Sequence, residues 1–169
     1  MKPALLARVN AAGEQIGGDR ASKTLALHRC IYVADPTAGC VIHSHCTHLV
    51  ALTLQGVWSA DDIVPPITPY FVMKVGHVPL IDYKRPGDPA AAEAVFARVR
   101  ASHDRGLPLR AVMLERLGPV AWHASPAEAS AVLEDLEETA RLWLLCQPRP
   151  EPLDATRIDA LRAAFGARW

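Results

Sequence analysis

Several features are scarce or missing from this sequence of 169 residues. Its four cysteines, Cys30, Cys40, Cys46 and Cys146, contain no Cys-x-x-Cys pair, which argues against a zinc ribbon or a redox motif. Lys plus Arg and Asp plus Glu both number 18, so no net charge favours nucleic acid or an anionic membrane. The start lacks the apolar core of a signal peptide, and no apolar run is long enough to span a membrane. These absences predict a cytoplasmic protein with reduced thiols.

The composition that remains is that of one ordinary globular domain. Hydrophobic residues make up 50% of the chain and charged residues 21%, which is enough to bury a core. The length fits a single domain over residues 1–169 and is short for two.

The pattern of apolar residues and turn formers mixes helices with short strands. Residues 6–19 resemble a hairpin, Ser22 is a plausible N-cap for a helix, and Cys40–Ile42 is a short β-branched run typical of a buried strand. A second helix is expected from His48 to Gly56.

The second half of the chain continues the mixture. We expect strands at 71–73, 78–81, 109–114 and 119–122, and helices at 90–106, 125–146 and 154–166. Ser125 and Glu128 form a capping box, and Trp122, Leu136 and Trp143 are expected in the core. The pattern predicts an α/β domain with a sheet between helices.

His43-Ser44-His45 is the most informative triplet. Residues i and i+2 of an extended chain point to the same side, so both imidazoles can reach one ion at the strand exit. Such a pair suits zinc, manganese, cobalt or iron, although an exposed polar turn is the plainer interpretation. His48, three residues later, is a candidate third ligand or an exposed first-turn histidine.

Four segments together resemble one known family. HSHCTHLVAL (43–52) is similar to the HxH segment of class II aldolases, and residues 67–88 and 113–145 resemble its subgroup of 3-oxo-tetronate 4-phosphate decarboxylases. The opening, residues 6–32, falls into the same register. The resemblance to the class II aldolase/adducin family therefore spans residues 6–162.

The resemblance implies a fold, a metal site and a reaction. It implies a single α/β/α domain with a central, mainly antiparallel sheet. Members bind one divalent ion, zinc first with manganese or cobalt as alternatives, through three histidines. The ion polarises a substrate carbonyl during cleavage of a carbon–carbon bond. A glutamate moves protons, a loop near the N-terminus holds the substrate phosphate, and the subunits form tetramers.

Three departures from the family pattern fall in that same site. Leu117 occupies the third-histidine position, and Thr24 stands where the family glutamate is expected. The N-terminal phosphate-loop segment is absent, and Ser22 is the phosphate contact that remains. His48, His123 and Glu115 are possible replacement ligands. A threonine hydroxyl replaces a carboxylate as acid or base only with an activating partner.

Other polar side chains have two interpretations each. Tyr70 and Tyr83 are candidates for a phenol supplied to a neighbouring subunit's site, or for aromatic packing. Arg85 is a candidate for binding a substrate phosphate or carboxylate, or it pins its turn to Asp88. Three acids on one predicted helix are expected to form a solvated face: Glu134, Glu137 and Glu138.

The sequence thus supports a metal-dependent lyase with a diverged site, acting on a small phosphorylated oxo acid or ketose. In this hypothesis Thr24 and Tyr83 are catalytic, Ser22 and Arg85 bind substrate, and the metal ligands are His43, His45 and His48. The alternative is an inactive, adducin-like binding domain. A third hypothesis is that the chain begins at an internal methionine of a diverged gene and has little function of its own. A homo-oligomer is expected in the first two cases.

Overall fold

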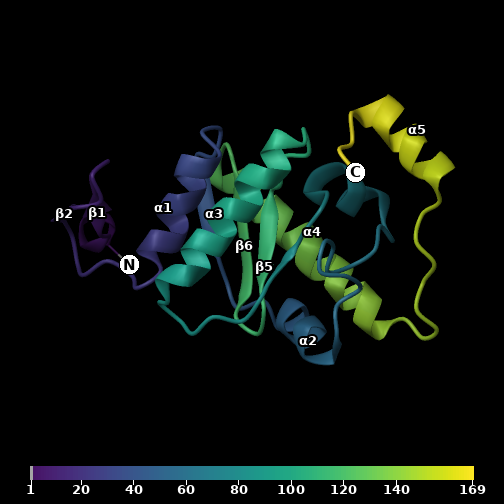
Figure 1. Cartoon of the computed structure of the whole chain (residues 1–169), viewed down its shortest axis with the longest axis horizontal. Helices are drawn as coiled ribbons and strands as arrows, with labels where there is room; N and C mark the ends of the chain where they lie inside the picture. The colour runs from purple at the N-terminus through teal and green to yellow at the C-terminus, as the bar shows by residue number, and fades with distance from the viewer. Residues whose placement is uncertain (1) are drawn as a thin grey trace.

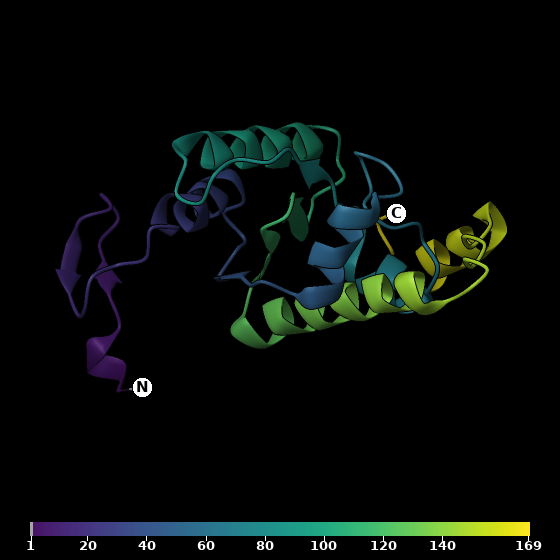
Figure 2. The same ribbon diagram turned by 90° about the horizontal axis from the view of Figure 1, so that it is seen from below.

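The structure is a computed structural model, described for residues 2–169, in which a sheet lies between two helical layers (Figures 1 and 2). Helices α1 (Leu25–Ala34) and α3 (Pro89–Asp104) cover one face of the sheet. Helices α2 (Thr47–Gln55) and α4 (Pro126–Leu145) cover the other. Within residues 2–169, no helix is long and apolar enough to cross a membrane.

The central sheet has the strand order β3-β6-β5-β4. Its strands are β3 (Cys40–His43), β4 (Leu80–Ile81), β5 (Ala111–Leu114) and β6 (Gly118–His123). β6 pairs antiparallel with β3 and β5, whereas β4 pairs parallel with β5. The prediction of an α/β fold with a mainly antiparallel sheet is therefore confirmed.

Side chains of the two central strands alternate between the helical layers, as the pleat of a strand requires. Met113 and Ala121 pack toward α2 and α4, where Leu136 and Trp143 complete one core cluster. Val112, Val120 and Trp122 pack toward α1 and α3 in a second cluster. Burial on both faces explains why these strands are continuously apolar.

The two ends of the chain lie outside these layers. Strands β1 (Arg8–Val9) and β2 (Gln15–Gly17) form the predicted hairpin, which extends away from the sheet in Figure 2. A short 3-10 turn, η1 (Pro3–Leu5), precedes this hairpin. Helix α5 (Ala155–Phe165) follows α4 and contacts the turn η2 (Phe71–Val75).

Two sequence-based predictions of local structure are wrong. The segment 71–73 is not a strand but part of η2, a π-helical turn. Thr68 explains the difference, because its hydroxyl accepts the Phe71 amide at 3.2 Å and its carbonyl accepts the Val72 amide. Helix α1 begins at Leu25 with Thr24 at its N-cap, two residues after the predicted N-cap, Ser22. The Oγ of Ser22 accepts the Thr24 amide at 3.2 Å.

The helical acids do not all face solvent, which corrects a third prediction. Glu137 of α4 accepts the backbone amides of His48 and Leu49, at 3.0 and 3.1 Å, and so caps the start of α2. The residue at the N-cap of α2, Cys46, makes no side-chain capping bond. A carboxylate at a helix N-terminus also interacts favourably with the helix dipole.

The capping box of α4 is confirmed. Ser125 Oγ accepts the amide of Glu128 at 3.3 Å and donates to its carboxylate at 2.7 Å. Helix α3 begins equally well defined, because the Asp88 carboxylate accepts the Ala90 amide at 3.1 Å. These caps fix both helices against the sheet that carries the histidines.

Candidate functional site

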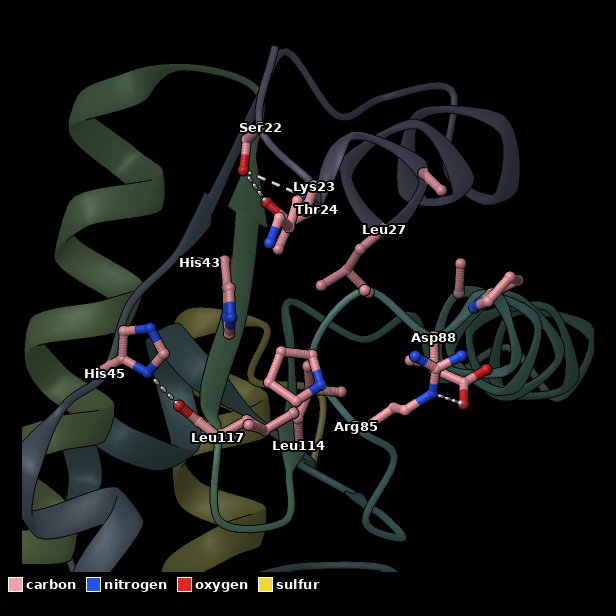
Figure 3. A pocket seen from close by; sticks show the side chains of 16 residues that line it. Ser22, Lys23, Thr24, Leu27, His43, His45, Arg85, Asp88, Leu114 and Leu117 are labelled. Atoms are coloured by element: carbon pink, nitrogen blue, oxygen red, sulfur yellow. Dashed lines mark hydrogen bonds and ion pairs between the residues drawn. The ribbon is translucent and has the colours of Figure 1, made fainter. Parts of the chain in front are cut away.

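A cavity of about 340 Å³ opens where β3 ends (Figure 3). Three separate segments contribute polar side chains to its lining: residues 22–24, the histidine pair, and the turn 85–88. Leu27, Leu114 and Leu117 supply apolar surface between them. A concave, mainly apolar site with a few convergent polar groups is the usual form of a small-molecule pocket.

His43 and His45 both line this cavity, as the i, i+2 spacing predicted. Their ring centroids lie 5.4 Å apart. Nδ1 of His43 lies 2.9 Å from the Pro119 carbonyl oxygen, and Nδ1 of His45 lies 2.7 Å from that of Leu117. The carbonyls of Pro119 in β6 and of Leu117 just before it therefore orient His43 at the end of β3 and His45 two residues beyond it.

These hydrogen bonds decide which nitrogen of each ring is free. A carbonyl oxygen only accepts, so each Nδ1 carries the proton and each Nε2 keeps its lone pair. Metal-binding histidines commonly have this arrangement, with the second nitrogen held by a carbonyl or carboxylate. The pair is therefore preorganised to offer two Nε2 donors to a cation.

Electrostatics favour the neutral form of the inner histidine. Burial lowers the pKa of His43, and the nearby His45 lowers it further, against the opposing effect of the Pro119 carbonyl. Burial likewise lowers the pKa of His28, to which His43 adds a smaller effect. Neutral imidazole is the form that binds metal, so His43 is ready to bind at neutral pH.

The turn between β5 and β6 brings Leu117 to the cavity. Arg116 adopts φ 62°, a left-handed conformation that is uncommon for arginine. Gly118 has φ 130°, and a Cβ there would overlap the Ser44 carbonyl oxygen. The close approach of this turn to residues 44 and 45 places Leu117, rather than a third ligand, beside the histidine pair.

Ser22, Lys23 and Thr24 line another wall of the cavity (Figure 3). The hydroxyl groups of Ser22 and Thr24 lie 2.9 Å apart and share a hydrogen bond. The sequence predicted roles for these two residues but not for Lys23. The sequence did contain one indication for Lys23. It is a basic residue just before the start of a helix, a position where anions bind well.

Arg85 makes the turn contact to Asp88 that the sequence left open, and its substrate-binding role stays a prediction. It lines the cavity, and its Nε lies 3.5 Å from the carboxylate of Asp88, which also lines it. The Arg85 side chain is 76% exposed, so this ion pair leaves donors free for a ligand.

The remaining candidates do not line the cavity. His48 is bonded to Glu137 at 2.8 Å, and His123 lies 3.1 Å from Glu128 beyond the opposite end of β3. Glu115 accepts the backbone amide of Tyr83, whose own side chain is half exposed. Among residues 2–169, no group of three His, Cys, Asp or Glu side chains is placed to hold a metal ion.

Sequence comparisons agree with this geometry. The profile of the class II aldolase and adducin N-terminal domain matches residues 1–144. A 3-oxo-tetronate 4-phosphate decarboxylase of Cupriavidus necator is 51% identical over 174 residues, which cover 100% of this chain and 77% of that protein. The enzyme of the same name from Escherichia coli K12 is 38% identical, over 96% of this chain and 74% of its own length.

Solved structures share the fold. The crystal structure of YgbL from Escherichia coli superimposes with a TM-score of 0.85 at 36% identity, covering 96% of this chain and 75% of that one. An L-fuculose 1-phosphate aldolase gives a TM-score of 0.72 at 18% identity, over 94% of this chain and 70% of its own. At this low identity the match supports the fold alone. The chain therefore belongs to the class II aldolase and adducin family.

Proposed function

We propose that this chain is a divalent-metal-dependent lyase that decarboxylates a small phosphorylated 3-oxo acid. The observation that carries the proposal is the histidine pair, His43 and His45, held by backbone carbonyls in a cavity that also contains Arg85. The names of the relatives that are 51% and 38% identical specify 3-oxo-tetronate 4-phosphate as their substrate.

The donor set fits a divalent ion in part. The imidazoles of His43 and His45 would provide half of the tetrahedral shell that zinc prefers. The side chain of Leu117 provides no donor, so water or substrate oxygens would complete the shell. The chemistry that an ion supplies in such a site is polarisation of a carbonyl.

Decarboxylation suits a site without the family's glutamate. Loss of CO2 from a 3-oxo acid breaks the bond between the carboxylate carbon and C2, and the electron pair moves toward the C3 carbonyl. No base is needed to begin this step, whereas a proton must reach C2 afterwards. The absence of a carboxylate at position 24, where Thr24 stands, therefore affects protonation of C2 and not the loss of CO2.

The other residues of the cavity bind and orient the substrate in this proposal. Lys23 and Arg85 stand on different walls and supply positive charge for the phosphate and the carboxylate. The hydroxyl groups of Ser22 and Thr24 supply hydrogen bonds to the same groups. The apolar side chains of Leu27, Leu114 and Leu117 exclude water from the reacting carbons.

CO2 release from 3-oxo-tetronate 4-phosphate tests the proposal, with zinc, manganese or cobalt added to the purified chain. We expect turnover by the wild type and a loss of at least about a hundredfold in a His45→Ala variant. His103→Ala is the matched control, because His103 is exposed at the end of α3. A folded wild type that releases no CO2 with any ion would instead support the inactive binding domain.

Tyr83 takes part in catalysis in this proposal only if copies of the chain assemble into an oligomer. Its side chain is 50% exposed and lies outside the cavity lining, so a catalytic role would be exercised in a neighbouring copy's site. Light scattering that gives a tetramer, together with reduced activity of Tyr83→Phe, would support that role. A fully active monomer would exclude it.

A further inference from the structure

Another hollow lies at the opposite end of β5 from the histidine cavity, between η2 and the segment that follows α5. Its volume is about 200 Å³, and its lining includes Gly76, Arg110, Gly166 and Arg168. Two arginines and no acidic residue line it. It shares no lining residue with the cavity that contains the histidine pair.

Arg110 differs from the one other partly buried arginine of the chain. Arg98 is ion-paired with Asp61, as a partly desolvated cation normally is. Arg110 makes no side-chain hydrogen bond and no ion pair with any residue in the described range 2–169. Removing a cation from water without a partner is unfavourable, so this position calls for an anion.

The nearest acids are already engaged. Asp35 accepts hydrogen bonds from Thr37 and from the Trp122 indole, and Glu128 is bonded to Ser125 and His123. Burial lowers the pKa of Arg110 and the positive charge of Arg168 lowers it further, whereas the negative charges of Glu128 and Asp35 raise it. Neither acid forms an ion pair with Arg110, so its guanidinium keeps donors for an anion.

The chain segment that carries Arg168 is anchored beside the hollow. The Trp169 ring stacks on His77 with centroids 4.5 Å apart and packs against Phe71 at 5.4 Å. The Nε of Arg162 donates to the Trp169 carbonyl at 2.9 Å. Arg168 is thus held near Arg110 by its neighbours and not by an ion pair of its own.

We propose that the hollow lined by Arg110 and Arg168 binds a small oxyanion, either a phosphate or a carboxylate group. Guanidinium groups present several N–H donors in a plane and pair with both kinds of anion. This site is separate from the decarboxylation proposed above and does not depend on it.

Titration of the purified chain with inorganic phosphate, and separately with malonate, tests the site at low ionic strength. Amide resonances of Gly76 and Gly166 are followed by NMR, because these residues line the hollow. We expect saturable shifts with at least one anion, and at least tenfold weaker binding in Arg110→Gln and Arg168→Gln. Arg105→Gln, an exposed arginine outside both hollows, and Arg85→Gln should leave the shifts unchanged.

Thermal unfolding separates binding from a folding defect. Arg110→Met keeps the length of the side chain without its charge, and should unfold at the same temperature as the anion-free wild type or higher. Saturating anion should raise the midpoint for the wild type but not for this variant. No saturable shift at Gly76 and Gly166 with either anion, or binding unaffected by both glutamine substitutions, would overturn the proposal.

Discussion

At the residue scale, the turn between β5 and β6 places Leu117 beside the histidine pair. Leu117 lines the same cavity as His43 and His45, and its carbonyl oxygen binds the Nδ1 of His45. The backbone at this position therefore orients the histidine pair, while the side chain offers no ligand.

A Leu117→His substitution should restore a third nitrogen. We expect divalent-ion affinity to rise by roughly tenfold or more, because another neutral ligand joins two that are already oriented. Competition with a chromophoric chelator measures this change. Leu117→Asn, which is polar but a poor nitrogen ligand, is the control, and equal affinity of the two variants would contradict the assignment.

Sequence reasoning found the histidine pair because extended chain has a fixed period of two. It did not exclude His48, His123 or Glu115 as third ligands, because their positions depend on partners far along the chain. His48 is bonded to Glu137, 89 residues away, and Glu115 binds the Tyr83 amide. Such side chains are oriented by contacts between residues far apart in the chain, and the periodicity of the sequence carries no information about these contacts.

At the element scale, the start of α2 depends on a side chain of another helix. The carboxylate of Glu137 accepts two backbone amides at the α2 N-terminus and contacts the His48 ring. The helix pattern from His48 to Gly56 predicted α2 to within one residue at each end, whereas no signal near it revealed the cap. The same limit explains the wrong strand at 71–73, where a Thr68 cap favours a helical turn.

Replacing Glu137 with alanine should destabilise the protein by about 1–2 kcal/mol, the typical loss for a helix N-cap. Glu138→Ala is the matched control. Its exposed ion pair with Arg141 is expected to contribute less than about 0.5 kcal/mol. Urea unfolding at pH 7 measures both values, and equal losses would show that the Glu137 contacts do not stabilise α2.

At the scale of the whole molecule, α1 is joined to the sheet by a buried polar contact as well as by apolar packing. Asp35, at the end of α1, accepts the Trp122 indole N–H of β6 at 2.9 Å and the Thr37 hydroxyl at 2.7 Å. The three-layer arrangement was predictable from the mixture of strands and helices, but this contact was not. Asp35 directly precedes Pro36 in the sequence, and no local pattern there indicates a contact with Trp122.

Stability should therefore depend on the ionisation of Asp35. Burial by itself raises the pKa of Asp35, but hydrogen bonds from Thr37 and Trp122 outweigh it, so the net pKa is lowered. An aspartate whose folded pKa is below its unfolded value of about 3.9 stabilises the fold above that pH. The stabilisation is lost as the pH falls through the folded pKa.

An Asp35→Asn variant should lower the free energy of unfolding by about 1–3 kcal/mol at pH 7, since charged hydrogen bonds become neutral ones. The difference from wild type should shrink below about pH 4. Urea unfolding at several pH values measures this, with Asp104→Asn, an exposed residue, as control. A difference that stays constant with pH would show that the charge of Asp35 is not responsible.

The histidine pair connects all three scales, because β3, the β5–β6 turn and the family fold are what bring His43 and His45 together. Calorimetric titration of the purified chain with zinc or manganese tests this most directly, in the wild type, in His43→Ala/His45→Ala and in His103→Ala. We predict one weak site per chain in the wild type and in His103→Ala, and its loss in the double variant. Binding that survives in the double variant, or a folded wild type that binds neither ion, would contradict the metal site.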